Sequence, residues 1–278
     1  MMKLLPGVVC GVAIALTSLA SGAVAAPVGE KDFDCVIEPQ QTVKLATQAL
    51  GVLARLDVDR GDLVHKGQIV GKLDDAVDAA NLALAAARAS NDNEVAAGQA
   101  RQAFLRRKYS RASQLVTDNI VSRATTDEAE SDMKVAESQL KLAELNLRIA
   151  QLEVKQTSEV LQQRTLVSPI DGVVVERLLV PGEYRNDQSP ILTLAQIDPL
   201  RVEVFVPTAY YGQIQAGSKA EVHPEPPING SFAATVTVVD RVMDAASGTF
   251  GVRLRLPNPD LALPAGIRCT VRFASGTP

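Results

Sequence analysis

Two stretches of the chain repeat one pattern: GVLARLDVDRGDL at residues 51–63 and GVVVERLLVPGEY at residues 172–184. In each copy a Gly-Val pair is followed ten residues later by a second glycine, Gly61 or Gly182, and the copies are 121 residues apart. Glycine permits the positive φ angles of tight turns, and the short apolar runs between the glycines favour strands. Because a few short strands cannot bury a face alone, we expect the two halves to press together into a small β-sandwich.

The segment between the halves is helical in composition. Residues 75–163 contain no proline, one glycine, and many residues with high helix propensity. A heptad seam in steps of three and four runs through Met133, Ala136, Leu140, Ala143, Leu147, Ala150, Val154, Thr157 and Leu161. A thinner seam precedes it at Ala79, Leu82, Ala86, Ala89, Asn93, Ala96, Ala100 and Ala103. These seams predict a long antiparallel α-helical hairpin, with arms of about 40 residues that reach about 60 Å at 1.5 Å per residue.

The turn of this hairpin is expected between Val116 and Thr126, and Thr126 with Asp127 suits the start of the second helix. The second arm also carries an additional apolar stripe at Val135, Leu142, Leu145, Ile149 and Leu152. Two interpretations of the stripe remain open. It faces a neighbouring copy or another protein, or it widens the contact inside the hairpin.

The remaining segments complete the domain organisation. Residues 202–206, 235–239 and 252–256 alternate as strands do, with turn signals between them, which is typical of a small antiparallel β-barrel. The sequence therefore predicts an elongated α+β chain. Its parts are a signal peptide (1–25), an N-terminal strand with the first half of the sandwich (26–74), the helical hairpin (75–163), the second half of the sandwich (164–197), the barrel (198–273) and a tail (274–278).

The first residues have the pattern of a signal peptide. Lys3 precedes an apolar run from Leu4 to Leu19, and Ala23-Val24-Ala25 offers the small residues that a signal peptidase needs. We expect cleavage near Ala25 and export of the mature chain, with a retained membrane anchor as the alternative. The mature chain keeps Cys35 and Cys269, each in a strand-like run. An oxidising compartment favours a disulfide between them, and two buried free thiols are the alternative.

The arrangement resembles a known family. A hairpin inserted in a split lipoyl-like β-sandwich and followed by a β-barrel is similar to the HlyD-type membrane fusion proteins, the periplasmic adaptors of tripartite pumps. The segments that carry the resemblance are GDLVHKGQ at 61–68, SPIDGVV at 168–174 and NPDLALPAG at 258–266. The resemblance implies a periplasmic scaffold that works as a homo-oligomer, a ring of six copies.

The tip of the hairpin adds a more specific match. Adaptors of this family carry an Arg, a Leu four residues on and a Ser seven residues after that, which here are Arg111, Leu115 and Ser122. The resemblance implies that they contact a TolC-like outer-membrane channel. An Arg fork suits carbonyls or carboxylates, a Leu offers an apolar knob, and a Ser caps the second helix or donates locally. The plain alternative is that all three are ordinary helix residues without a partner.

The resemblance also implies an inner-membrane transporter as a partner. Adaptors of resistance-nodulation-division (RND) efflux pumps usually carry a further membrane-proximal domain, whereas the sequence given continues only five residues beyond Phe273. Despite this departure from the pattern, we expect an RND pump that exports small molecules. An ABC-type exporter or a type I secretion system is the alternative.

Other classes of function fit less well. A lipoyl or biotinyl carrier would present a modifiable lysine where the halves join, but the helical insert occupies that junction, and neither Lys66 nor Lys72 has the acceptor context. The net charge of -4 gives no basic footprint for nucleic acid. The two His and three Cys lack metal-ligand spacing, so we expect no metal or cofactor. An acidic cluster could serve as general acids or metal ligands, but such residues more often form turns and helix starts, so we expect no enzyme. The cluster is Asp57, Asp59, Asp62, Asp74, Asp75 and Asp78.

Overall fold

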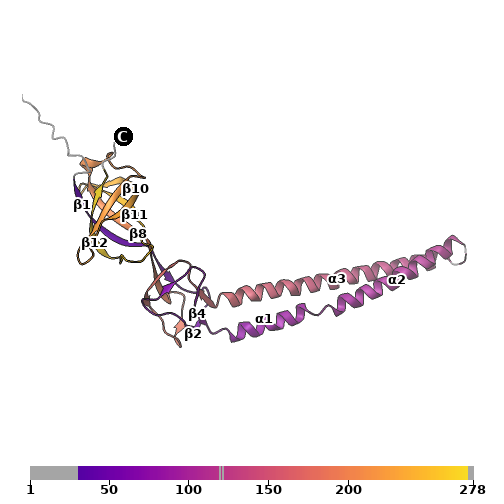
Figure 1. Cartoon of the computed structure of the whole chain (residues 1–278). Coiled ribbons are helices and arrows are strands. Elements are labelled where there is room, and N and C mark those ends of the chain that lie inside the picture. The colour runs from indigo at the N-terminus through magenta and orange to yellow at the C-terminus, as the bar shows by residue number, and fades with distance from the viewer. Residues whose placement is uncertain (1–30, 119, 121, 275–278) are drawn as a thin grey trace, which may run out of the picture. The chain divides into compact units, whose positions relative to one another are not determined.

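The structure is a computed structural model that describes residues 31–118, 120 and 122–274 (Figure 1). The expected signal peptide at residues 1–25 lies outside the described residues, as does the tail beyond residue 274. The described chain divides into two compact units. One comprises residues 38–201 and 257–266, and the other comprises residues 31–37, 202–256 and 267–274. The first contains both copies of the repeat and the helices, and the second contains Cys35 and Cys269.

The two copies of the repeat form matching strands. β2 (Gly51–Leu56) and β6 (Gly172–Arg177) start at the first glycine of each copy. The two-residue strands β3 (Leu63–Val64) and β7 (Tyr184–Arg185) follow the second glycine. That glycine has a φ angle of +94° at Gly61 and +97° at Gly182. Side chains with a Cβ are strained at such angles, so both copies need glycine for the same turn.

The copies exchange strands across the sandwich. β2 pairs with β7, and β3 pairs with β6, in both cases antiparallel. The backbone hydrogen bonds at the turns are reciprocal. The N–H of Gly61 donates to the carbonyl of Val174 at 2.9 Å. In the other copy, the N–H of Gly182 donates to the carbonyl of Leu53 at 2.8 Å. Each half therefore supplies the pairing partners that the other half lacks.

The exchange encloses one apolar core. β4 (Ile69–Leu73) lies between β2 and β5 (Thr165–Val167), and β8 (Leu192–Pro207) pairs with β6. Removing these apolar side chains from water is the main stabilising contribution. The buried members are Leu45, Leu53, Val58, Val64, Val70, Leu73, Leu166, Ile170, Val174, Ile191, Leu192 and Leu194.

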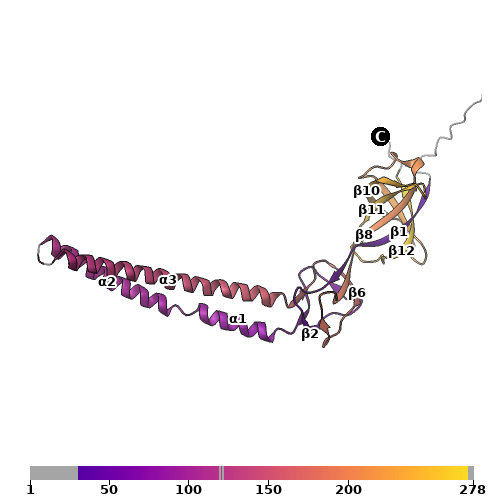
Figure 2. The same cartoon turned by 180° about the vertical axis from the view of Figure 1, so that it is seen from behind.

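Three helices are inserted between the copies: α1 (Ala76–Ala89), α2 (Asn93–Thr117) and α3 (Arg123–Gln162). The 40-residue α3 returns unbroken beside α2 and α1 (Figures 1 and 2). The first arm was expected as one helix and is instead broken between Ser90 and Asp92. Ser90 Oγ donates to the carbonyl of Ala87 at 2.9 Å, and Asn91 Oδ1 accepts the N–H of Asn93 at 3.3 Å. Because such side chains compete for backbone hydrogen bonds, this polar run ends one helix and starts the next.

The second helix of the hairpin begins earlier than expected. α3 starts at Arg123, so the expected start at Thr126 and Asp127 is wrong. Ser122 is the N-cap, and its Oγ accepts the N–H of Thr125 at 3.3 Å. A hydroxyl at this position satisfies a backbone donor that the first helical turn leaves without a partner.

The contact between the arms follows the expected seam throughout α3 and in part on α1, where Leu82 and Ala89 are half-buried and Ala79 and Ala86 are exposed. Every expected seam residue of α3 is buried or half-buried, whereas Ala96, Ala100 and Ala103 of α2 are exposed. The expected register of α2 is therefore wrong, because the break resets the rotation of the helix. The residues of α2 that are less exposed are Val95, Gly98, Gln102, Leu105, Tyr109, Ala112 and Val116.

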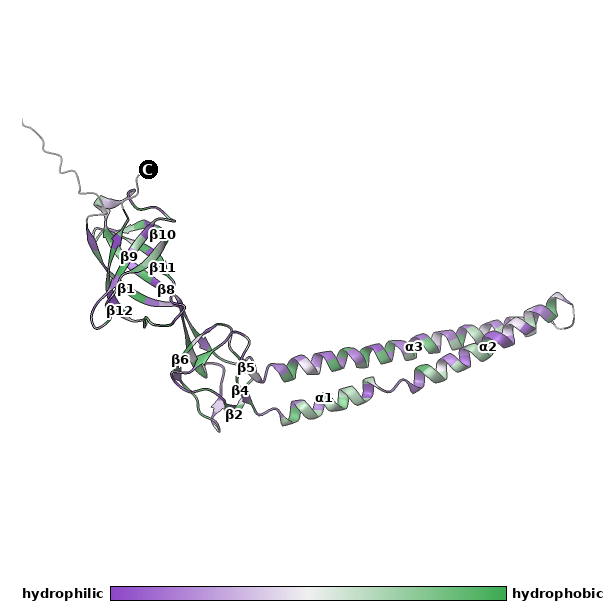
Figure 3. Cartoon of the chain, viewed as in Figure 1, coloured by the Kyte–Doolittle hydropathy of each residue, from purple (hydrophilic) through white to green (hydrophobic). Residues whose placement is uncertain are grey.

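The other unit is a β-barrel. In order of pairing, its strands are β1 (Asp32–Leu45), β12 (Ile267–Phe273), β9 (Lys219–Pro224), β10 (Phe232–Asp244), β11 (Thr249–Leu256) and β8, which pairs back to β1. Along β11, Phe250, Val252, Leu254 and Leu256 are buried and the residues between them are more exposed. This alternation follows from the two-residue period of a strand. Apolar and polar residues also alternate along neighbouring strands (Figure 3).

β1 and β12 carry the two cysteines. Cys35 lies directly opposite Cys269 in the antiparallel pair, with their Cα atoms 4.9 Å apart. The structure joins their Sγ atoms in a disulfide, and both side chains are buried. Since 234 residues separate them in sequence, the bridge would tie the first strand of the described chain to the last.

Candidate functional site

The tip of the hairpin presents Arg111 and Leu115. They lie four residues apart in the last turns of α2, so they share one face of the helix. Arg111 is exposed, and 38% of Leu115 is exposed. A guanidinium fork beside an apolar side chain can bind a carboxylate or backbone carbonyls next to an apolar socket.

Ser122, the third expected tip residue, has a different environment. Its hydroxyl accepts the Thr125 N–H and lies 3.0 Å from Thr125 Oγ1. The structure therefore gives Ser122 a capping role within its own chain, although the residue is exposed. The structure places Arg111 and Leu115 on one face and Ser122 at the start of the next helix. Asn119 and Val121 of the turn lie outside the described residues.

The apolar stripe of α3 lies outside the hairpin contact. More than half of each residue's surface is exposed, from 51% at Val135 to 58% at Leu142. The interpretation that the stripe widens the contact between the arms is therefore wrong. The stripe comprises Val135, Leu142, Leu145, Ile149 and Leu152.

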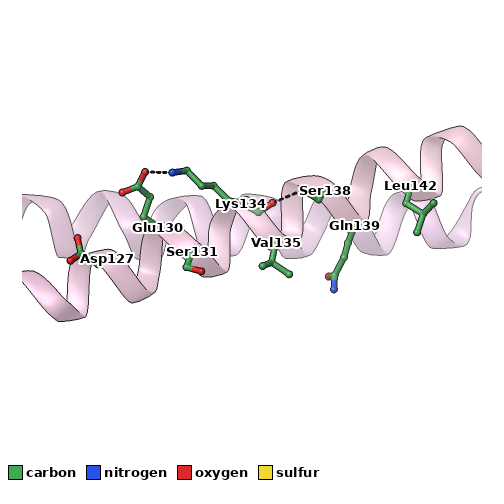
Figure 4. Close-up of a pocket in the computed structure, with 8 residues that line it drawn as sticks. All are labelled: Asp127, Glu130, Ser131, Lys134, Val135, Ser138, Gln139 and Leu142. Atoms are coloured by element: carbon green, nitrogen blue, oxygen red, sulfur yellow. Dashed lines mark hydrogen bonds and ion pairs between the residues drawn. The ribbon is translucent and has the colours of Figure 1, made fainter.

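A shallow groove extends this stripe toward the tip (Figure 4). Val135, Gln139 and Leu142 point to one side of α3, and the Nζ of Lys134 lies 2.6 Å from an Oε atom of Glu130. The hydrogen bond and charge of Glu130 raise the pKa of Lys134, so this ammonium stays charged at neutral pH. The groove is lined by Asp127, Glu130, Ser131, Lys134, Val135, Ser138, Gln139 and Leu142.

The polar half of this groove was not recognised in the sequence. Ser131 and Ser138 continue the heptad spacing of Val135 and Leu142, but an apolar pattern search does not detect serines. The sequence feature that could have revealed this half of the groove is the small serine side chain at positions that continue the stripe. Small side chains leave room for a large side chain from a partner helix.

The acidic cluster near the base of the hairpin consists of carboxylates with partners. The N–H of Arg60, followed by the guanidinium of Arg177, holds the pKa of Asp59 below its usual range. Such a group stays ionised and does not suit a general acid. The partners are Arg55 for Asp57 (2.7 Å), Arg177 for Asp59 (3.1 Å), the N–H of Asp59 for Asp62 (2.7 Å), the N–H of Ala76 for Asp74 (3.2 Å), Lys72 for Asp75 (2.5 Å) and Arg164 for Asp78 (2.6 Å).

Lys72, a candidate acceptor for a carrier, is thus held by Asp75 in an ion pair. Among the described residues, no three His, Cys, Asp or Glu side chains are grouped so that they could hold a metal ion. Within the same part of the chain, none of the helices combines the length and apolar character needed to cross a membrane.

Comparisons with known proteins identify both β regions. Residues 41–196 match the family described as "CzcB-like, barrel-sandwich hybrid domain". Residues 200–277 match the family described as "CusB-like, beta-barrel domain". The first match covers more than half of the chain and includes all three helices.

Individual proteins are similar to most of the chain. An uncharacterized protein of Haemophilus influenzae is 23% identical over 245 residues, and a UPF0194 membrane protein of Yersinia pseudotuberculosis is 29% identical over 286 residues. These matches cover 87% and 84% of this chain, which spans 56% of the Haemophilus protein and 86% of the Yersinia protein. The crystal structure of MacA from Actinobacillus actinomycetemcomitans superposes with a TM-score of 0.74 at 20% identity. It covers 88% of this chain and 78% of that one, which shows a shared fold.

Proposed function

Because the chain belongs to the membrane fusion protein family, whose barrel-sandwich hybrid region it contains at residues 41–196, we propose that it is the periplasmic adaptor of a tripartite efflux system. In this role it links an inner-membrane transporter to a TolC-like outer-membrane channel during the export of small molecules. Members of this family are adaptors and not enzymes, so the chain is not an enzyme and the carrier hypothesis is set aside.

The exposed pair Arg111 and Leu115 at the tip carries this proposal. A helix that ends in water gains nothing from an exposed Leu, whereas a channel rim can bury it while Arg111 binds carbonyl or carboxylate oxygens. Ser122 contributes by starting α3 at a fixed point, so that the tip presents Arg111 and Leu115 in one orientation.

Assembly completes the proposed mechanism. The signal peptide directs the chain to the periplasm and is cleaved near Ala25. Six copies form a ring, in which the hairpins line up and the sandwiches and barrels surround a conduit. The transporter, an RND pump in our first expectation and an ABC exporter in the alternative, supplies the energy.

The variant Arg111→Asp, expressed in place of the unchanged protein, tests the proposed contact with the outer-membrane channel. The reversed charge should abolish capture of the outer-membrane channel and export, because the guanidinium donors are replaced by acceptors. Arg101→Asp is the matched control, since Arg101 is also an exposed arginine of α2 but lies about 15 Å farther from the tip at 1.5 Å per residue. Crosslinking in envelopes followed by pull-down identifies the transporter class. Normal channel capture and export by Arg111→Asp would show that the tip assignment is wrong.

A further inference from the structure

α3 has two apolar faces on nearly opposite sides of the helix. One is the seam through Ala136 and Leu140, which α2 covers. The other is the exposed stripe from Val135 to Leu152, whose members are spaced by seven, three, four and three residues. This is the spacing of a second coiled-coil seam. A helix with two such faces is suited to packing between two other helices.

α2 has a complementary face that points away from α3. Ala97, Ala100, Phe104 and Arg107 follow one another in steps of three and four, and all are exposed. Phe104 is the largest of them, and 55% of its surface is exposed. The large side chain of Phe104 therefore projects from this face, with small alanines on one side of it and the cation of Arg107 on the other.

The contacts inside the hairpin fix the heights of these two faces along the helices. Lys108 Nζ lies 3.0 Å from Asp132 Oδ2, and a Cβ added at Gly98 would lie 3.1 Å from Leu140 Cδ1. Between these two contacts, Phe104 is about level with Ala136, so it has the same height as the groove between Val135 and Leu142.

We propose that the outward face of α2 in one copy packs into the α3 groove of the next copy. The ring of Phe104 then occupies the groove next to Val135, where the small side chain of Ser138 leaves room for it. Arg107 is about level with Met133, and its long side chain can reach Glu130, which lies about 4.5 Å nearer the tip at 1.5 Å per residue. The Glu130 carboxylate can then accept from Arg107 as well as from Lys134. This inference rests on the proposed ring of adaptors and adds the surfaces that form it.

The occupant of the groove is a second copy for reasons of charge, size and height. The rim carries Asp127 and Glu130, and the α2 face offers Arg107. Nearer the base, Arg88 Nη1 lies 3.2 Å from Glu153 Oε1, which places the exposed Ala87 near the height of Leu152. Small residues on one face therefore meet large residues on the other along both parts of the first arm. Because the two faces differ and point in opposite directions, the contact is heterologous and repeats from copy to copy.

Paired cysteines test this contact in intact envelopes. We expect Ala100→Cys with Ser138→Cys to give a ladder of crosslinked copies after mild oxidation, which reducing agent collapses to the monomer. Both substitutions replace small exposed residues, so the hairpin should keep its helix content by circular dichroism. The control pair is Ala100→Cys with Glu137→Cys, because Glu137 has nearly the same height but lies on a flank of α3. Each single variant should give no ladder.

Two results would overturn the inference: no ladder from the Ser138 pair, or an equal ladder from the Glu137 pair. Capture of the outer-membrane channel is measured in the same envelopes. If capture persists without the Ser138 ladder, the assignment of faces is wrong and the adaptor role stands. If the Ser138 ladder forms without capture, the contact between copies stands and the proposed channel partner is wrong.

Discussion

Arg164 binds Asp78 across the base of the hairpin, with Nε donating to Oδ2 at 2.6 Å. The Nη1 of the same guanidinium donates to the carbonyl of Leu50 at 2.5 Å. One side chain therefore joins the segment just after α3, the first turn of α1 and the chain just before β2. Only 23% of the Arg164 side chain and 14% of the Asp78 side chain are exposed, so water screens this ion pair weakly.

Arg164→Met should lower the free energy of unfolding by about 2 kcal/mol, because it leaves a mostly buried carboxylate and a carbonyl without their donor. Urea unfolding measures the change. Arg55→Met is the matched control, since Arg55 and its partner Asp57 are 57% and 36% exposed, and such pairs contribute about 0–1 kcal/mol. Equal effects of the two variants would contradict the role of Arg164 as a clamp.

Gly98→Ile should destabilise the hairpin by about 1–3 kcal/mol, since the added side chain meets Leu140 where the helices approach closely. Ala103→Ile places the same side chain on an exposed position of α2 and should change stability little. Thermal unfolding followed at the helix signal compares the two. A hairpin that tolerates both substitutions equally would rule out close packing at Gly98.

Ser122→Ala should cost about 1 kcal/mol through loss of the N-cap, and Ser122→Asp should restore most of it because Asp caps equally well. Channel capture then separates two roles of this residue. If Ser122 acts only through the cap, Ser122→Asp captures the channel like the unchanged protein. Failure of Ser122→Asp despite normal stability would indicate direct contact between the hydroxyl and the channel.

Reduction of the mature protein should lower its stability, because a bridge between Cys35 and Cys269 restricts an unfolded loop of more than 200 residues. Chain entropy alone assigns about 5 kcal/mol to a loop of that length. Thiol titration in denaturant without reductant should find no free thiol in the cleaved chain. Two free thiols would establish the alternative of buried, unbridged cysteines.

The sequence predicted the elements where one local signal dominates. The paired glycines Gly61 and Gly182 indicated the two turns, and the large apolar residues of α3 indicated its seam. The register of α2 was wrong because alanines at several spacings fit a seam equally well, and the polar break at residues 90–92 changes which of them face α3. The larger residues Leu105 and Tyr109, at the positions that are less exposed, were the better signal.

The candidate site was predictable only in part, for a physical reason. Arg111 and Leu115 were found through a short motif that the chain carries on one helix. The clamp between Arg164 and Asp78 joins residues 86 positions apart, and no local pattern marks such a pair. The pairing of β2 with β7 and of β3 with β6 is similarly invisible, because alternation predicts strands and not their partners.

The exchange of strands between the two copies has a consequence for the order of folding. A nascent chain that has reached residue 163 possesses all three helices but none of β5, β6 or β7, so its first half has no partner strands. Helices form from local contacts and fast, whereas pairing across 121 residues must overcome the entropy of closing a long loop. Once α3 has packed along the length of α1, however, Arg164 already lies beside Asp78. The hairpin thereby shortens the loop that must be closed to a few residues, so we expect the sandwich to form after the helices and to depend on their pairing.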